Sequence, residues 1–157
     1  MTKIKIASWN INSVRLRIGQ IARFAAEQNP DIITLQEIKC LEDQFPREDC
    51  EAMGYRYIEI SGQKGMHGTA TISKLPMTRM DTDFCPLGHA RHTSTRISTG
   101  TASKDFEVHN FYIPAGGDEA DIETNPKFAH KMDFLAAMTD YFTARAKADP
   151  IAENRLV

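Results

Sequence analysis

Apolar and polar positions in the first forty residues predict a strand, a helix and a second strand. Residues 3–9 alternate between apolar and polar side chains, which is typical of a strand. Over residues 14–28 apolar side chains recur at helical spacing, and Ser13 is a suitable N-cap. The segment 29–31 ends this helix, and the apolar run 32–36 follows as a strand. Strand–helix–strand order favours two parallel neighbouring strands.

The remaining pattern predicts a short helix, several strands and one long helix. The short helix covers residues 46–53 and ends at a glycine. The long helix covers residues 126–147, with its apolar side chains on the buried face. Those side chains are Phe128, Met132, Leu135, Met138 and Phe142. The strand candidates are residues 55–60, 68–73, 93–98 and 106–113, and residues 155–157 resemble the start of another. The chain is therefore predicted to be α/β, with strands of mixed direction.

Length and composition favour one globular domain over residues 1–157. The chain is 41% hydrophobic and 25% charged, and no apolar run approaches the ~20 residues of a membrane span. With 19 basic and 21 acidic residues the formal charge is −2, so a nucleic-acid partner would need a local basic face. The three cysteines lack a CxxC pair, and we expect reduced thiols in a cytoplasmic protein.

Two polar side chains follow the first two predicted strands. Asn10 and Glu37 would emerge at the same edge of the sheet if these strands are parallel neighbours. One carboxylate with amide oxygens suits Mg²⁺, which keeps several waters and needs few protein ligands. The alternative is that Glu37 is an ordinary surface charge.

Three further segments could bind a phosphate or line a site. The glycine-rich segment 62–68 contains Lys64 and could cradle a phosphate, or it could be a plain hairpin turn. Arg96 could clamp a phosphate or be an exposed edge-strand charge. Tyr112 could present its phenol at a sheet edge or be a buried structural tyrosine. The histidines contain no HExxH motif, and we expect no metal role for the polar loop 88–92.

Taken in order, five motifs resemble exonuclease III, the bacterial branch of the exonuclease–endonuclease–phosphatase superfamily. They are residues 8–15, 35–39, 62–65, 112–114 and 127–135. The resemblance implies the N-terminal portion of a four-layer, DNase I-like α/β sandwich, with a mixed sheet flanked by helices. Thr69, Thr71 and Ala115 depart from the residues usual in that family.

The resemblance also implies roles for individual residues. Asn10 and Glu37 would hold a divalent metal, Mg²⁺ or Mn²⁺, with Glu37 as its direct ligand. Tyr112 would be an active-site residue beside the scissile phosphate, so that Tyr112 and Glu37 form the catalytic pair. Asn12, Lys64 and Arg96 would contact or position the DNA phosphates. The implied function is a DNA repair nuclease that hydrolyses phosphodiesters at abasic sites and 3′ ends of duplex DNA.

Members of the family are longer, and two of their C-terminal motifs, Gly-Asp-x-Asn and Ser-Asp-His, do not occur in these 157 residues. We therefore expect a truncated domain that supplies about one sheet, with impaired catalysis and a sheet face exposed for self-association. Two alternatives remain. The chain could be a non-catalytic DNA-binding fragment or pseudoenzyme, or a phosphodiesterase of the same superfamily with a non-DNA substrate.

Overall fold

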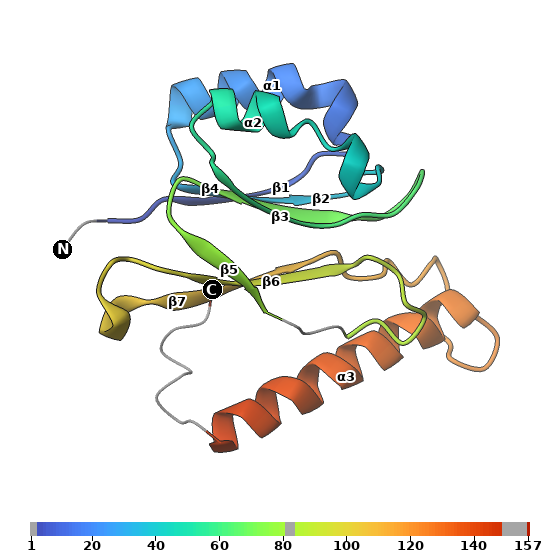
Figure 1. Ribbon diagram of the computed structural model, residues 1–157. Helices are drawn as coiled ribbons and strands as arrows, with labels where there is room; N and C mark the ends of the chain where they lie inside the picture. The colour runs from blue at the N-terminus through green and yellow to red at the C-terminus, as the bar shows by residue number, and fades with distance from the viewer. Residues whose placement is uncertain (1–2, 81–83, 149–156) are drawn as a thin grey trace.

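Four layers stack in the computed structural model, which describes residues 3–80, 84–148 and 157 (Figure 1). Two helices, α1 (Val14–Gln28) and α2 (Arg47–Ala52), cover the outer face of a four-stranded sheet. A three-stranded sheet packs on the other face of that sheet, and helix α3 (Pro126–Ala148) covers the outer face of the second sheet. The α/β architecture with mixed sheets flanked by helices is confirmed.

The first sheet contains the predicted parallel pair. Its strands are β1 (Ile6–Asn10), β2 (Ile32–Gln36), β3 (Tyr57–Ser61) and β4 (Thr69–Ser73), in the spatial order β1-β2-β4-β3. Strands β1 and β2 are parallel and joined by α1, whereas β4 is antiparallel to both of its neighbours. Because β1 and β2 are in register, Asn10 pairs with Gln36 and both strands end at the same edge.

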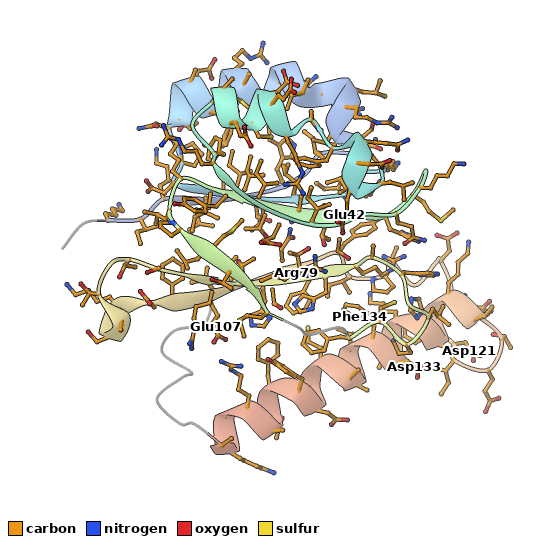
Figure 2. All side chains as sticks on the ribbon, viewed as in Figure 1. Glu42, Arg79, Glu107, Asp121, Asp133 and Phe134 are labelled. Carbon is orange, nitrogen blue, oxygen red and sulfur yellow. The ribbon has the colours of Figure 1, made fainter. Side chains whose placement is uncertain are left out.

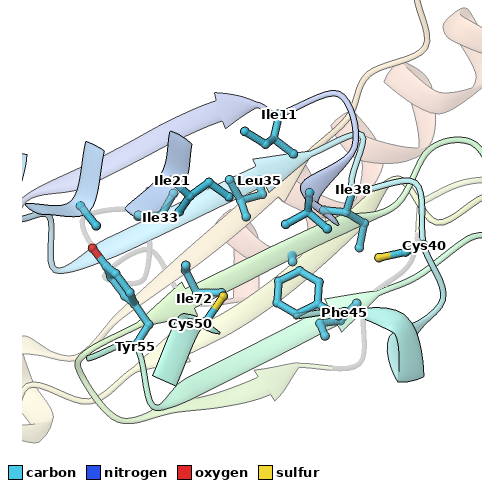
Figure 3. Packing of buried hydrophobic residues seen from close by; sticks show 14 residues of the cluster. Ile11, Ile21, Ile33, Leu35, Ile38, Cys40, Phe45, Cys50, Tyr55 and Ile72 are labelled. Atoms are coloured by element: carbon cyan, nitrogen blue, oxygen red, sulfur yellow. The ribbon is translucent and has the colours of Figure 1, made fainter. Parts of the chain in front are cut away.

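The larger hydrophobic core lies between this sheet and its two helices (Figure 3). Alternate residues of β2 and β4, including Ile33, Leu35 and Ile72, point into it and are fully buried. The hydroxyl of Tyr55, also buried, donates a hydrogen bond of 2.9 Å to the carbonyl of Pro30. This core fixes the positions of the β1 and β2 ends.

The second sheet is an antiparallel meander. Its strands are β5 (Met77–Met80), β6 (His92–Ile97) and β7 (Phe106–Phe111), in that spatial order. The sequence pattern did not predict β5, a four-residue strand. Short 3₁₀ turns, Glu42–Gln44 and Ala102–Lys104, complete the described elements.

The expectation of one sheet with an exposed apolar face is wrong. The second sheet covers the face of the first, and near the site this interface is largely polar. The buried hydroxyls of Thr69 and Thr93 lie 2.6 Å apart across it. Apolar packing between the sheets is confined to the other end, where Ile32 meets Ile97 and Val108. Polar pairing therefore replaces the hydrophobic surface on which the predicted self-association depended.

Helix α3 packs on the second sheet through a face that includes the predicted Met138 and Phe142 but is centred on Phe134. Phe134 lies between α3 and the sheet (Figure 2) and is fully buried, whereas Met132 is 43% exposed. The apolar cluster beside Phe134 includes Phe84, Phe111 and Phe142. The predicted stripe therefore omitted Phe134 and included Met132, which is exposed.

The predicted strand at 155–157 falls mostly on residues outside the described ones, but Val157 is described. Its N–H donates to the carbonyl of Glu107 (2.9 Å), and its carbonyl accepts from the N–H of His109 (3.0 Å). This pattern is that of a parallel partner on the free edge of β7. No helix among the described residues is long and apolar enough to cross a membrane.

Candidate active site

The ends of β1 and β2 continue past the strands as a pair of tight turns. The N–H of Ile11 donates to the carbonyl of Gln36 (3.0 Å), and the N–H of Ser13 donates to that of Glu37 (2.7 Å). Asn12, Ser13 and Glu37 all have positive φ angles, of 47°, 83° and 54°. This conformation is uncommon for residues with a side chain, and it is often associated with functional sites. Ser13 makes no side-chain capping bond, so its place before α1 depends on the backbone pairing.

The carboxylate of Glu37 is the centre of the site. Its Oε1 accepts hydrogen bonds from the Asn10 amide (2.8 Å) and the Tyr112 hydroxyl (2.9 Å). Its Oε2 lies 3.0 Å from the ammonium of Lys39. The structure therefore brings together Asn10, Glu37 and Tyr112 from three different strand ends.

These contacts fix the charges of the site. The hydrogen bond from Asn10 is the largest cause that lowers the pKa of Glu37 to about 2, with Lys39 and Tyr112 adding to it against desolvation. Burial, followed by the hydrogen bond to Glu37, raises the pKa of Tyr112. At neutral pH Glu37 is therefore an anion and Tyr112 a neutral donor.

Two residues that the sequence analysis did not select complete the surroundings of Tyr112. The guanidinium of Arg91 lies over the Tyr112 ring, 4.8 Å from its centroid, and donates to the Tyr112 carbonyl (3.1 Å). It also lies 3.3 Å from Nε2 of His67. Burial, with the neighbouring Arg91 cation, lowers the pKa of His67 to about 4, so this imidazole is neutral at neutral pH.

Asn110 holds the two sheets together immediately behind the site. It is buried on β7, and its amide donates to the carbonyls of Leu35 (3.1 Å) and Ala70 (2.9 Å) in the first sheet. Its Oδ1 accepts from the Gln36 side chain (2.7 Å). Because Asn110 is two residues from Tyr112, this bonding fixes the tyrosine of the second sheet against Glu37 of the first.

Of the other predicted site residues, one lies within the site and two do not contact its described residues. Asn12 lies within the site, since its Oδ1 accepts a 2.6 Å hydrogen bond from Lys39. Lys64 is exposed in the β3–β4 hairpin loop, and no interaction joins it to Glu37. Arg96 lies towards the far end of β6, where its 60% exposed side chain pairs with Glu107 at 3.3 Å. The structure therefore does not bring Arg96 to the site, and Arg91 is the arginine beside Tyr112.

The donor set fits a hard divalent cation. Glu37 is ionised and Asn10 is beside it, and the site contains oxygen donors without a thiol. Mg²⁺ prefers oxygen ligands and retains several waters, so it is compatible with a single carboxylate. The ammonium of Lys39, bound to the same carboxylate, balances its charge in the absence of a metal.

A four-layer α/β fold with a polar site at the strand ends, built from both sheets, defines the class of protein. Residues 7–151 match the family described as the Endonuclease/Exonuclease/phosphatase family, and the chain belongs to this family.

Individual relatives agree with this assignment. The chain is 34% identical to exodeoxyribonuclease III of Haemophilus influenzae, covering 94% of this chain and 55% of that protein. It resembles the structure of a 3′ phosphatase from Neisseria bound to a product DNA hairpin, with 30% identity and a TM-score of 0.75 over 92% of this chain and 53% of the other. An AP endonuclease from Archaeoglobus fulgidus gives 28% identity and a TM-score of 0.74, covering 88% and 51%. The chain thus spans about half the length of these relatives.

Proposed function

We propose that this chain carries the metal- and phosphate-binding part of a DNA repair nuclease of the exonuclease III type. Its substrate would be duplex DNA with abasic sites or 3′ ends, in the cytoplasm, and its reaction the hydrolysis of a phosphodiester to a 3′-hydroxyl and a 5′-phosphate. The observation that supports this best is the Glu37 carboxylate bound by Asn10 and Tyr112 from opposite sheets. The DNA-bound Neisseria relative also supports a DNA substrate.

In this proposal each residue has a separate task. Glu37 and Asn10 hold the divalent metal, which supplies charge stabilisation for the phosphoryl oxygens when bound. Tyr112 can donate its hydroxyl proton in a hydrogen bond to a phosphate oxygen, because its raised pKa keeps it protonated. Lys39 and Arg91 supply positive charge on either side of Glu37 and Tyr112. Asn12 orients Lys39 through their hydrogen bond.

Activation of the attacking water is the step that the described residues support least. Asn10, Lys39 and Tyr112 are the groups that interact with Glu37, and no second carboxylate is among them within the described residues. Glu37 itself is too acidic to be an efficient base, since its pKa is about 2. A positioned acid–base group contributes typically ~10²–10⁴-fold. We therefore propose that the 157-residue chain binds DNA and cleaves it slowly.

The experiment is a nicking assay on a duplex with one abasic site, with Mg²⁺ or Mn²⁺, on the wild-type chain, Glu37→Gln and Tyr112→Phe. We expect slow metal-dependent nicking that Glu37→Gln abolishes and Tyr112→Phe reduces by about 10²-fold. Glu51→Gln, at an exposed glutamate of α2, and Tyr57→Phe, at an exposed tyrosine of β3, are matched controls that should nick as the wild type does.

Three outcomes would contradict parts of this proposal. Nicking unaffected by Glu37→Gln would remove Glu37 from catalysis. Turnover near the ~10 s⁻¹ typical of enzymes would refute slow cleavage. A salt-dependent gel shift without any nicking would favour the alternative of a non-catalytic DNA-binding fragment. This is the second candidate because no second carboxylate interacts with Glu37 among the described residues.

A further inference from the structure

Three potential metal ligands meet beside the second sheet, apart from the oxygen donors around Glu37. Cys85 and His89 lie in the loop between β5 and β6, and His130 lies near the start of α3. One ligand atom from each residue lies within 4.8 Å of the other two. The Cys85 Sγ and His130 Nε2 atoms are 3.9 Å apart.

Local structure explains why the two loop residues converge. The N–H of Gly88 donates to the carbonyl of Cys85 (2.9 Å), which closes a turn, and Gly88 has a positive φ of 64°. Cys85 and His89 therefore flank one tight turn with Cys-x₃-His spacing, close to the short ligand spacings of zinc sites. Phe84 anchors the start of the loop on α3, with its ring centroid 4.8 Å from that of Tyr141.

One ring nitrogen of this cluster is left unsatisfied by the described protein groups. Nδ1 of His89 is buried and has no hydrogen-bond partner among the residues described. Cys85 is only 7% exposed. A buried polar atom without a partner costs free energy, typically about 1–3 kcal/mol, and a bound ion is one of the explanations for it.

We propose that Cys85, His89 and His130 form a binding site for a divalent transition metal of the zinc class. A thiolate and two imidazoles are the ligands that select zinc over magnesium. Three protein ligands leave the fourth tetrahedral position to water. Zinc bonds of about 2.3 Å to sulfur and 2.0–2.1 Å to nitrogen place these atoms about 3.5 Å apart. Ligand atoms that are now up to 4.8 Å apart must therefore approach one another by at most about 1.3 Å, which side-chain rotation can supply.

This metal would fasten the β5–β6 loop to α3 next to the candidate active site. His89 and His130 line a pocket of about 470 Å³ together with His67 and Arg91. The His89 ring stacks on that of His67, with centroids 4.9 Å apart. The metal would therefore stabilise the side of this pocket that contains Arg91. The proposed metal site does not depend on the proposed nuclease function.

Cobalt(II) titration of the whole chain tests the site directly. With excess Mg²⁺ present to occupy the oxygen site at Glu37, we expect one Co²⁺ per chain, a thiolate-to-cobalt charge-transfer band and tetrahedral d–d bands, all displaced by one equivalent of Zn²⁺. Cys85→Ser should remove the charge-transfer band, and His89→Gln and His130→Gln should each weaken binding by about tenfold or more. Cys50→Ala, at a buried cysteine of the other core, and Glu37→Gln should keep the wild-type spectrum.

A second measurement needs no variant and so does not depend on their folding. Zn²⁺ should slow alkylation of the Cys85 thiol, measured by peptide mass spectrometry, and leave the rates at Cys40 and Cys50 unchanged. Absence of a thiolate–cobalt band in the wild-type chain, or its persistence in Cys85→Ser, would overturn the proposal. Equal protection of all three cysteines would also overturn it, because it would indicate general stabilisation.

Discussion

The Glu37 carboxylate accepts two hydrogen bonds and forms an ion pair with Lys39, and protonation would weaken these contacts. Protonation of Glu37 is therefore coupled to folding. Its pKa is about 2 in the folded chain against an ordinary value of 4.5. A depressed folded-state pKa gives stability that is fully present above pH 4.5 and is lost as the pH falls towards about 2.

We therefore expect Glu37→Gln to remove part of the acid dependence of the unfolding free energy. Urea denaturation between pH 4.5 and 2 measures this dependence. The wild type should take up about one more proton on unfolding in this window than the variant does. Glu51→Gln, on an exposed part of α2, serves as the control. Identical pH profiles for Glu37→Gln and the wild type would refute the coupling.

At this scale the sequence predicted Asn10, Asn12, Glu37 and Tyr112, which lie at or just beyond strand ends, and missed Arg91 and His67. Asn10, Glu37 and Tyr112 each follow a recognisable strand, so parallel pairing and the family motifs were enough to place them together. Arg91 precedes β6 in a loop whose polar sequence suggested no role. Arg96 was selected instead because it lies in a strand, but strand geometry moves it about 3.3 Å per residue away from that end.

At the scale of the elements, the interface between the sheets contains buried threonine hydroxyls with and without hydrogen-bond partners among the described residues. Thr69 shares a hydrogen bond of 2.6 Å with Thr93, whereas the buried hydroxyl of Thr71 has no partner among the described residues. The two threonines are on the same strand and face the same layer, so they form a matched pair.

Replacing these threonines by valine should have opposite effects. Thr71→Val removes an unsatisfied polar atom and should stabilise the fold by about 1 kcal/mol. Thr69→Val removes the 2.6 Å hydrogen bond to the Thr93 hydroxyl, which keeps only a 3.4 Å bond to the Thr69 carbonyl, and should destabilise the fold by about 1 kcal/mol. Chemical denaturation at neutral pH measures both. A loss of stability in Thr71→Val as large as that in Thr69→Val would show that the Thr71 hydroxyl is satisfied.

Helix α3 is joined to the second sheet by a buried charge as well as by Phe134. The Glu107 side chain on β7 is 4% exposed, and its Oε1 lies 2.5 Å from the Arg145 guanidinium of α3. Figure 2 shows Glu107 labelled on the sheet above this helix.

Arg145→Met should therefore destabilise the chain by about 1–3 kcal/mol, because the buried Glu107 carboxylate loses its shortest ion pair and keeps the 3.3 Å pairing with Arg96. Arg23→Met is the matched control, since Arg23 and Glu27 are a solvent-exposed pair whose loss should cost at most about 1 kcal/mol. Thermal unfolding of the two variants provides the comparison. Equal costs would mean that the Glu107 pair contributes no more than a surface pair.

The elements were predicted best where turn residues bound a clear apolar pattern. The bounds predicted for α1 and β2 are the observed ones, Val14–Gln28 and Ile32–Gln36. Strand β5 was missed because Met77–Met80 is too short to show a period, and it is defined by its pairing with β6. Sequence periodicity contains local information, whereas this strand depends on a tertiary contact.

For the molecule as a whole, the layer arrangement was only half predicted. The first sheet and its helices followed from the parallel strand–helix–strand pattern. The second sheet was not expected, since these 157 residues lack two C-terminal motifs of the family and were expected to supply about one sheet. The sequence pattern of the threonines and Asn110 does not reveal that they lie at this interface. Their burial depends on mutual hydrogen bonds between sheets, such as those from Asn110 to Leu35 and Ala70, which no local pattern reveals.

Charge distribution over the whole molecule leads to a prediction for DNA binding. The formal net charge is −2, so affinity for DNA must arise from cations gathered near the site. Lys127 lines the pocket that contains Arg91 and His67. Lys64 is exposed in the β3–β4 loop, and that loop is tied to the Arg91 segment by a 3.0 Å hydrogen bond from the Ala90 N–H to Gln63.

Each of these lysines, if it contacts a phosphate, should contribute to the salt dependence of binding. The logarithm of the binding constant falls with the logarithm of salt concentration by about 0.9 per phosphate contact. Lys127→Gln and Lys64→Gln should therefore each reduce the slope by about 0.9, as measured by fluorescence anisotropy on an abasic-site duplex. Lys104→Gln, in a separate pocket with Lys3 and Asp31, should leave the slope unchanged. An equal reduction of the slope by all three substitutions would contradict a localised interface, because only the lysines in such an interface should change the slope. It would indicate a diffuse attraction that depends on the total charge of the molecule and not on the position of each lysine.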